Sequence, residues 1–170
     1  MLSPAAAREA LVVMHDQFAE TMTTFPLLQG FTPQGAQRLL ERGEIRACAA
    51  GELLFKEGDP PAFALLVLGG KIQVFVERES GDMILTDVGQ GTILGELAVL
   101  CGIPRAASVR VRESATVLQW SAQAFRNLLL RYPLLSERVF KESLRTLVDK
   151  ERALIDSIAR LSRGNDQPSE

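Results

Sequence analysis

The chain has 170 residues, of which 46% are hydrophobic and 24% are charged, a composition typical of soluble globular proteins. This length allows one domain with a packed core and a helical extension. The net charge of -2 gives no general attraction to nucleic acids or anionic membranes. No apolar run reaches the ~20 residues needed to cross a bilayer, and two cysteines are too few for a disulfide framework. We therefore expect a cytoplasmic protein without a membrane span.

Residues 1–44 are predicted to form an N-terminal helical segment. An amphipathic helix is expected from about Pro4, with Ser3 as its N-cap, because five residues recur there at helical spacing. These residues are Leu11, Met14, His15, Phe18 and Met22. A second, shorter helix is expected from Pro33 to Glu41, with Thr32 as its cap and Gly43 as its stop signal.

Residues 45–120 change to a β-type pattern. Short runs of strand-forming residues alternate with turns that contain glycine. Residues 71–76 alternate between polar and apolar side chains at their start, and residues 107–112 alternate throughout. Ser80-Gly81-Asp82 predicts a hairpin turn between two strands. This spacing of strands and turns indicates an all-β sandwich or barrel.

Residues 121–170 return to a helical pattern. Ser121 is the expected cap of a short helix through Tyr132, and Pro133 opens a long helix to about Arg163. Along residues 140–161, apolar residues recur in alternating steps of four and three, with one polar break at Glu151. The stripe comprises Phe140, Leu144, Leu147, Leu154, Ile158 and Leu161. It fits either a homodimer seam or packing against the chain's own core.

Residues 95–108 place a carboxylate, Glu96, and a guanidinium, Arg105, at the two ends of a short apolar segment. A guanidinium holds phosphate oxygens through a fork of N–H donors, and a carboxylate accepts hydrogen bonds from sugar hydroxyls. Small residues between and after them allow the backbone to approach a compact ligand. The segment therefore predicts a site for a small anion that carries hydroxyls.

The same segment resembles the phosphate-binding cassette of the cyclic nucleotide-binding domains found in the catabolite activator and protein kinase A regulatory family. Residues 95–98 read Gly-Glu-Leu-Ala, and residues 104–108 read Pro-Arg-Ala-Ala-Ser, at the separation seen in that family. The flanking Gly70 and Gly91 also match, whereas Leu94 replaces the family's usual aromatic residue. The resemblance covers about residues 25–145.

The resemblance implies a mainly β fold with flanking helices: an eight-stranded β-roll (a double-stranded β-helix, jelly-roll-like) with N-terminal helices and a long C-terminal helix. It implies cAMP as the preferred ligand, with cGMP possible, and no further cofactor or metal. Glu96 is expected to bind the ribose 2′-hydroxyl and Arg105 the cyclic phosphate, while residues 96–101 form a short helix. Ser108 is expected near the phosphate or the purine. The implied ligand-binding set is Gly95, Glu96, Leu97, Ala98, Arg105, Ala106, Ala107 and Ser108.

An enzyme is not expected. A metal-dependent β-barrel enzyme needs several histidines, and His15 is the only one in the chain. Nor does the sequence show a nucleophile–base pair. A structural ion pair between Glu96 and Arg105 is the alternative to a ligand site.

The expected function is a cyclic nucleotide receptor whose C-terminal helices change conformation on binding. It would act on a separate protein effector or through a homodimer formed by residues 140–161. Nucleic acid is not expected as a partner, because residues 133–170 carry equal numbers of acidic and basic residues. Two alternatives remain open: a fragment of a transcription regulator that lacks its DNA-binding domain, and a degenerate dimerisation or interaction module without a ligand.

Overall fold

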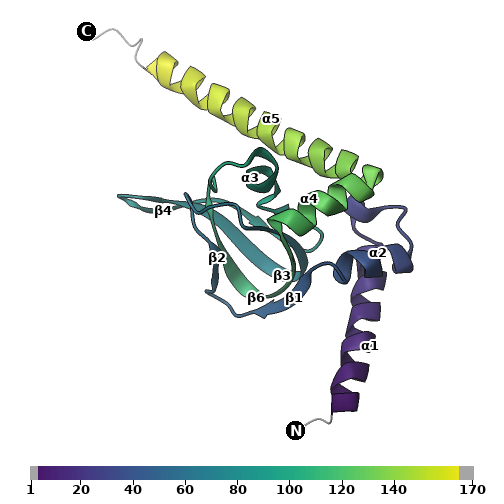
Figure 1. The fold of residues 1–170 in the computed structure, drawn as a ribbon. Coiled ribbons are helices and arrows are strands. Elements are labelled where there is room, and N and C mark those ends of the chain that lie inside the picture. The colour runs from purple at the N-terminus through teal and green to yellow at the C-terminus, as the bar shows by residue number, and fades with distance from the viewer. Residues whose placement is uncertain (1–3, 165–170) are drawn as a thin grey trace, which may run out of the picture.

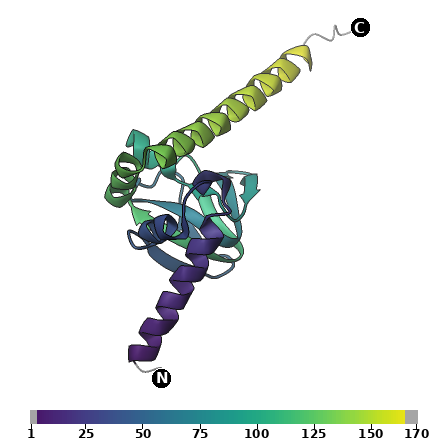
Figure 2. The ribbon, with the colours of Figure 1, turned by 90° about the vertical axis from the view of Figure 1, so that its right-hand side faces the viewer.

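An antiparallel sheet forms the centre of the molecule, and helices extend from it in two directions (Figure 1). This architecture comes from a computed structural model that describes residues 4–164, with side chains from Val12 to Arg160. The N-terminal helix α1 (Pro4–Met22) and the C-terminal helix α5 (Pro133–Gly164) leave the body at opposite ends (Figure 2). No helix within the described residues is long and apolar enough to cross a membrane.

The N-terminal helices lie as the sequence predicted. After α1, a 3-10 turn η1 (Pro26–Leu28) leads into α2 (Pro33–Leu40). The Thr32 hydroxyl caps α2 by accepting a hydrogen bond from the Gly35 N–H at 3.1 Å. The predicted cap at Ser3 lies outside the described residues.

Six strands make up the sheet in the described part of the chain. They are β1 (Glu44–Cys48), β2 (Leu53–Phe55), β3 (Phe63–Arg78), β4 (Gly81–Val88), β5 (Ile93–Leu94) and β6 (Ser108–Ser121). The order along the sheet is β1-β6-β3-β4, with β2 paired to β6 and β5 paired to β3. The fold class is therefore confirmed, but the count of eight strands is wrong. The two long strands β3 and β6 stay paired through register shifts instead of ending.

The hairpin between β3 and β4 lies one residue earlier than predicted. Arg78 pairs with Gly81, so Glu79 and Ser80 form the turn and Gly81 already belongs to β4. Strand β4 lies at the end of the sheet order and is exposed along almost its whole length.

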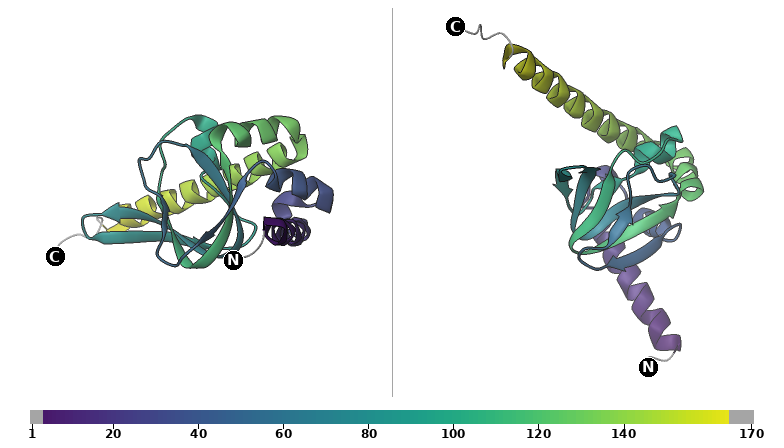
Figure 3. Two further views of the ribbon diagram at one scale, coloured as in Figure 1. Left: turned by 60° about the horizontal axis from the view of Figure 1, so that its bottom comes forward. Right: turned by 90° about the vertical axis from the view of Figure 1, so that its left-hand side faces the viewer.

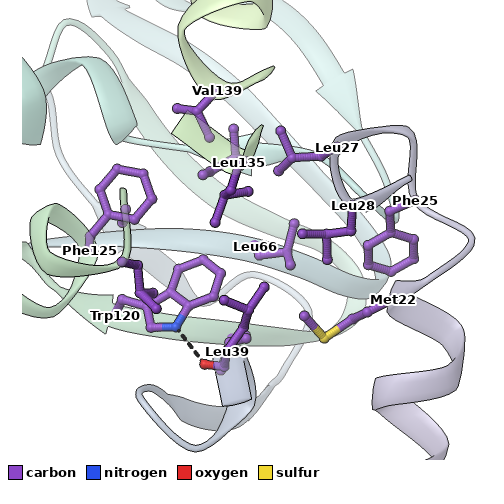
Figure 4. Packing of buried hydrophobic residues seen from close by; sticks show 14 of the residues in the cluster. Met22, Phe25, Leu27, Leu28, Leu39, Leu66, Trp120, Phe125, Leu135 and Val139 are labelled. Atoms are coloured by element: carbon purple, nitrogen blue, oxygen red, sulfur yellow. Dashed lines mark hydrogen bonds between the residues drawn. The ribbon is translucent and has the colours of Figure 1, made fainter. Parts of the chain in front are cut away.

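Two hydrophobic clusters hold the sheet and helices together. One lies within the folded sheet and includes Leu65, Val67 and Val117. The other lies between the sheet and the helices and includes Trp120, Phe125 and Leu66 (Figure 4). The Trp120 indole N–H donates to the Leu39 carbonyl of α2 at 2.9 Å, which satisfies its one polar group inside the core. Trp120 is 2% exposed and is therefore a core residue.

Two further helices precede α5. The short helix α3 (Glu96–Cys101) lies between β5 and β6, and α4 (Ala122–Arg131) follows β6. The Ser121 hydroxyl caps α4 by accepting from the Ala124 N–H at 3.1 Å, which confirms the predicted start. Leu135 and Val139 anchor the first turns of α5 in the core.

Beyond these turns α5 leaves the body of the domain, and its distal half projects past the sheet (Figure 3). The apolar stripe on α5 is not part of the hydrophobic core. Its members Phe140, Leu144, Leu147, Leu154 and Ile158 are all exposed, and the side chain of Leu161 lies outside the described residues.

A candidate ligand-binding cavity

A cavity of about 930 Å³ opens between the sheet, α3 and α5. Seven of the eight predicted site residues line it, and they are Gly95, Glu96, Leu97, Ala98, Arg105, Ala106 and Ala107. The cavity is within the size range of small-molecule sites in proteins. The structure thus brings the two charged residues of the motif to one site.

The backbone before and after α3 shapes this wall of the cavity. Gly95 precedes α3 with φ of 75°, and Gly102 follows it with φ of 66°, both in the left-handed region. A Cβ at position 95 would overlap the Arg105 Nη1 atom, whereas a Cβ at position 102 would meet no atom within 4 Å. Gly95 is therefore required for both its backbone conformation and the close approach of the guanidinium.

Arg105 is a buried cation without a carboxylate partner in the described part of the chain. Its side chain is 3% exposed, and its guanidinium lies 4.2 Å from the ring centre of Phe55 and 5.0 Å from that of Phe63. Nη1 donates to the Gly95 carbonyl at 2.8 Å and Nη2 to the Phe63 carbonyl at 2.5 Å. Nε has no hydrogen-bond partner among the described residues.

Burial lowers the pKa of the Arg105 guanidinium, against the opposing charges of Asp59 and Glu96. Taking an ion out of water costs free energy that carbonyl dipoles and aromatic rings offset only in part. An anion in the cavity would supply the missing counter-charge.

Glu96 lies on the same cavity wall but does not pair with Arg105. Its Oε1 accepts a hydrogen bond from the Ser143 hydroxyl of α5 at 2.9 Å, and Ser143 is only 2% exposed. Burial raises the pKa of the Glu96 carboxyl, while the Ser143 hydrogen bond and the charge of Lys150 act in the lowering direction. No ion pair joins Glu96 to Arg105 within residues 12–160. A structural ion pair therefore does not account for the two charges.

Ser108 is the one predicted site residue that does not line the cavity. It is 1% exposed, and its hydroxyl accepts a hydrogen bond from the Glu57 N–H at 2.9 Å. In this structure its side chain holds the loop after β2 in place behind the cavity wall.

The far wall of the cavity comes from α5, which sequence reasoning did not identify. Its lining residues there are Arg138, Lys141, Glu142, Arg145, Thr146, Leu147 and Lys150. Nothing in the sequence shows that this part of α5 packs against the motif. The described residues contain no group of three or more His, Cys, Asp or Glu side chains that could hold a metal ion.

Comparisons with known proteins agree with this geometry. The family model for the cyclic nucleotide-binding domain matches residues 45–132, more than half of the chain. The chain is 31% identical over 116 residues to a cAMP-dependent protein kinase regulatory subunit from Emericella nidulans, covering 68% of this chain and 27% of that protein.

Among solved structures, the catabolite activator protein of Thermus thermophilus matches with a TM-score of 0.71 and 26% identity over 79% of this chain and 63% of that one. The regulatory domain of Toxoplasma gondii PKA, solved with cAMP, matches with a TM-score of 0.69 at 16% identity, covering 82% and 53% of the two chains. The latter likeness concerns the fold alone. This chain spans less than two thirds of the length of each of these relatives.

Proposed function

The chain belongs to the cyclic nucleotide-binding domain family, and on that basis we propose that it is a non-catalytic receptor for a cyclic nucleotide, with cAMP preferred over cGMP. The observation that carries the proposal is Arg105, a buried guanidinium without a carboxylate partner in the described chain, at the wall of a cavity. A cyclic phosphate carries one negative charge, which matches this one buried cation. The preference for cAMP is supported by the name of one relative, the cAMP-dependent protein kinase regulatory subunit of Emericella nidulans.

In this proposal the two charged residues hold opposite sides of the ligand. Arg105 neutralises the cyclic phosphate through the positive charge of its guanidinium. Glu96 accepts a hydrogen bond from the ribose 2′-hydroxyl. Ala98, Ala106 and Ala107 line the cavity, and their backbone N–H groups are expected to assist in binding the phosphate.

The hydrogen bond between Ser143 and Glu96 supports a conformational response of α5. A ribose hydroxyl and the Ser143 hydroxyl are donors to the same buried carboxylate. If the ribose hydroxyl takes the Oε1 atom that now accepts from Ser143, α5 loses this contact with α3. The ligand therefore favours conformations in which α5 has moved.

The output of the receptor passes to a second copy of the chain through residues 140–161, or to a separate effector protein. The exposed stripe on α5 supports this part of the proposal, because its apolar side chains are not used by the core. We place the receptor in the cytoplasm, where thiols such as the free Cys48 and Cys101 stay reduced.

Titration calorimetry of the full chain against cAMP, cGMP and cyclic dinucleotides tests the proposal. We expect binding of cAMP that weakens about a hundredfold or more in Arg105→Ala, because charge-assisted hydrogen bonds to the phosphate are lost. Arg105→Lys keeps the charge but not the fork of donors, so it should give an intermediate affinity. Arg112→Ala is the matched control, since Arg112 lies on β6 in an exposed ion pair with Asp87.

Two results would contradict the proposal. The absence of heat with every nucleotide would favour a degenerate interaction module without a ligand. Equal affinities for Arg105→Ala and wild type would show that the cassette does not hold the phosphate.

A further inference from the structure

The charged side chains that line the cavity are mostly cationic. Five cations and two carboxylates line it, although the chain as a whole carries a net charge of -2. The cations are Arg105, Arg138, Lys141, Arg145 and Lys150, and the carboxylates are Glu96 and Glu142. A cyclic phosphate carries one negative charge, which Arg105 matches. The proposed function therefore leaves the cations of α5 without a role.

Two of the α5 cations already act on other parts of the chain. The charge of Lys150 lowers the pKa of the Glu96 carboxyl, against the larger effect of burial. Arg138 donates hydrogen bonds to the carbonyls of Leu27 and Gln29 at η1. These contacts give Lys150 and Arg138 a structural explanation that is independent of any ligand.

Lys141 and Arg145 have no such explanation. Neither side chain forms an ion pair within residues 12–160, and Glu142 offsets only one of the two charges. Both residues are exposed, whereas Arg105 is buried in the same cavity. Lys141 and Arg145 therefore lie on the solvent side of the cavity, and Arg105 lies inside it.

The spacing of Lys141 and Arg145 makes them act together. They are four residues apart on α5, so their side chains are neighbours on the helix surface. Like charges at this spacing repel each other and destabilise a helix. An anion that approaches both side chains relieves this repulsion, so the pair attracts anions more strongly than either residue alone.

A pair of cations at the opening of a cavity affects how fast an anion enters. The walls of a cleft have a low dielectric constant and concentrate the field of the charges that line it. Because the chain has a net negative charge, an anionic nucleotide gains no attraction from the molecule as a whole. The attraction has to come from local cations, within about 10 Å at an ionic strength of about 0.1 M.

We propose that Lys141 and Arg145 form an outer site for the cyclic phosphate, which captures the nucleotide on α5 and steers it to the buried Arg105. This inference rests on the proposed function and adds a kinetic role for two residues outside the cassette. An exposed charge at the edge of a site changes the association rate and its salt dependence, whereas a buried hydrogen-bonded charge changes the dissociation rate. The outer site and Arg105 can therefore be separated by kinetics.

Stopped-flow fluorescence of the full chain measures both rate constants. The probe is cAMP with a fluorophore on the purine, which leaves the phosphate and the 2′-hydroxyl unmodified. At low salt, association should slow about threefold in Arg145→Glu and about tenfold in the double variant Lys141→Glu with Arg145→Glu. Dissociation should stay within about twofold of wild type in both. Arg105→Ala should instead show faster dissociation.

Salt provides a second readout that a loss of structure would not produce. Raising the ionic strength from about 20 mM to about 500 mM should slow association in wild type, because ions screen the exposed cations. The double variant should lose most of this dependence. At high salt the association rates of the two proteins should converge.

Arg160→Glu is the matched control, because it changes the net charge of the chain as much as Arg145→Glu does. Arg160 is exposed on the same helix and does not line the cavity. It lies fifteen residues beyond Arg145, about 22 Å along the helix axis, which is more than the screening length at about 0.1 M salt. Arg160→Glu should therefore bind the probe at the wild-type rate.

The possible results distinguish this inference from the proposed function. A wild-type chain that does not bind the probe overturns both. Binding that keeps its association rate in the double variant overturns the outer site and leaves the receptor in place. Faster dissociation in the double variant, with unchanged association, also overturns the outer site, because Lys141 and Arg145 would then hold the bound ligand. Equal slowing in Arg160→Glu and Arg145→Glu overturns it as well, since net charge alone would explain the rates.

Discussion

At the scale of single residues, the site depends on a glycine that no other residue can replace. An alanine at position 95 would have to adopt a left-handed conformation and would displace the Arg105 guanidinium. The left-handed conformation alone costs about 1–2 kcal/mol for a residue with a Cβ. The position thus combines a backbone requirement with a steric one.

We expect Gly95→Ala to lower the melting temperature and to abolish nucleotide binding, since Arg105 loses its place. Thermal unfolding and titration calorimetry measure the two effects. Gly102→Ala is the matched control, because φ at Gly102 is also left-handed but nothing lies within 4 Å of the added Cβ. It should lose a similar part of the stability and keep its affinity. Equal loss of affinity in both variants would mean that strain, and not the contact with Arg105, controls binding.

The buried carboxyl of Glu96 makes stability depend on pH in a defined direction. Its pKa in the folded protein is raised by burial, so the folded state holds this proton more tightly than the unfolded state does. The contribution is fully present below the ordinary carboxyl pKa, and it is lost as the pH rises through the raised value.

We expect Glu96→Gln to be as stable as wild type near about pH 4 and more stable than wild type at about pH 7. Glutamine keeps an oxygen that can accept from Ser143 but carries no charge to bury. Urea unfolding of both proteins at several pH values measures the difference, and the remaining titratable groups are common to both. Parallel stability curves across this pH range would show that burial of Glu96 has no effect on its titration.

At the scale of elements, α5 connects parts of the chain that are far apart in sequence. Ser143 binds Glu96 of α3, and Arg138 donates to the carbonyls of Leu27 and Gln29 at η1. The start of α5 is thus fastened to the cassette and to the N-terminal segment at once. Any displacement of this helix must break one of these hydrogen bonds.

We expect Ser143→Ala to bind cAMP about tenfold more tightly, because the ribose hydroxyl no longer displaces a donor from a charged group. The variant should also show faster amide exchange in the first half of α5 when no ligand is present. Ser157→Ala controls for the loss of a hydroxyl on the same helix, since Ser157 bonds only within α5. An unchanged affinity in Ser143→Ala would show that the ribose and Ser143 do not compete.

Most elements could be predicted from local signals in the sequence. Thr32 and Ser121 mark the starts of α2 and α4 because capping needs only the side chain and the next three residues. Strand number could not be predicted in the same way. The register shifts that let β3 and β6 continue depend on the pairing of these two strands, in which Phe63 pairs with Ser121, far away in the sequence.

At the scale of the whole molecule, the sequence predicted the site residues that belong to the cassette, but not the residues of α5 that complete the cavity. Glu96 and Arg105 share one short motif, so their residue types and spacing suffice to identify them. The contact of Ser143 with Glu96 and the position of Lys150 at the cavity depend on where α5 packs. For Ser108 the motif suggested a contact that the structure does not have. Its place in the motif predicted a ligand contact, but its hydroxyl accepts a hydrogen bond from the Glu57 backbone N–H.

The buried charge of Arg105 also predicts that the empty protein is less stable than the loaded one. At a nucleotide concentration a hundred times the dissociation constant, the fold should gain about 2.7 kcal/mol. For a chain of this size we expect the melting temperature to rise by about 5–10 °C. Differential scanning calorimetry with and without cAMP measures the rise, and Arg105→Ala, which binds about a hundredfold more weakly, should show a rise of at most about 2 °C. If cAMP raised the melting temperature of Arg105→Ala as much as that of wild type, residues other than Arg105 would account for the binding energy.

The two left-handed glycines around α3 have a mechanical consequence. The left-handed conformations of Gly95 and Gly102 set the directions in which the chain enters and leaves this six-residue helix. Helix α3 is also bound to α4, because the Arg126 side chain of α4 donates a hydrogen bond to the Val99 carbonyl of α3 at 2.8 Å. A tilt of α3 therefore pulls on α4 at one end and on α5, through Ser143, at the other. A ligand that moved α3 would in this way change the positions of both α4 and α5.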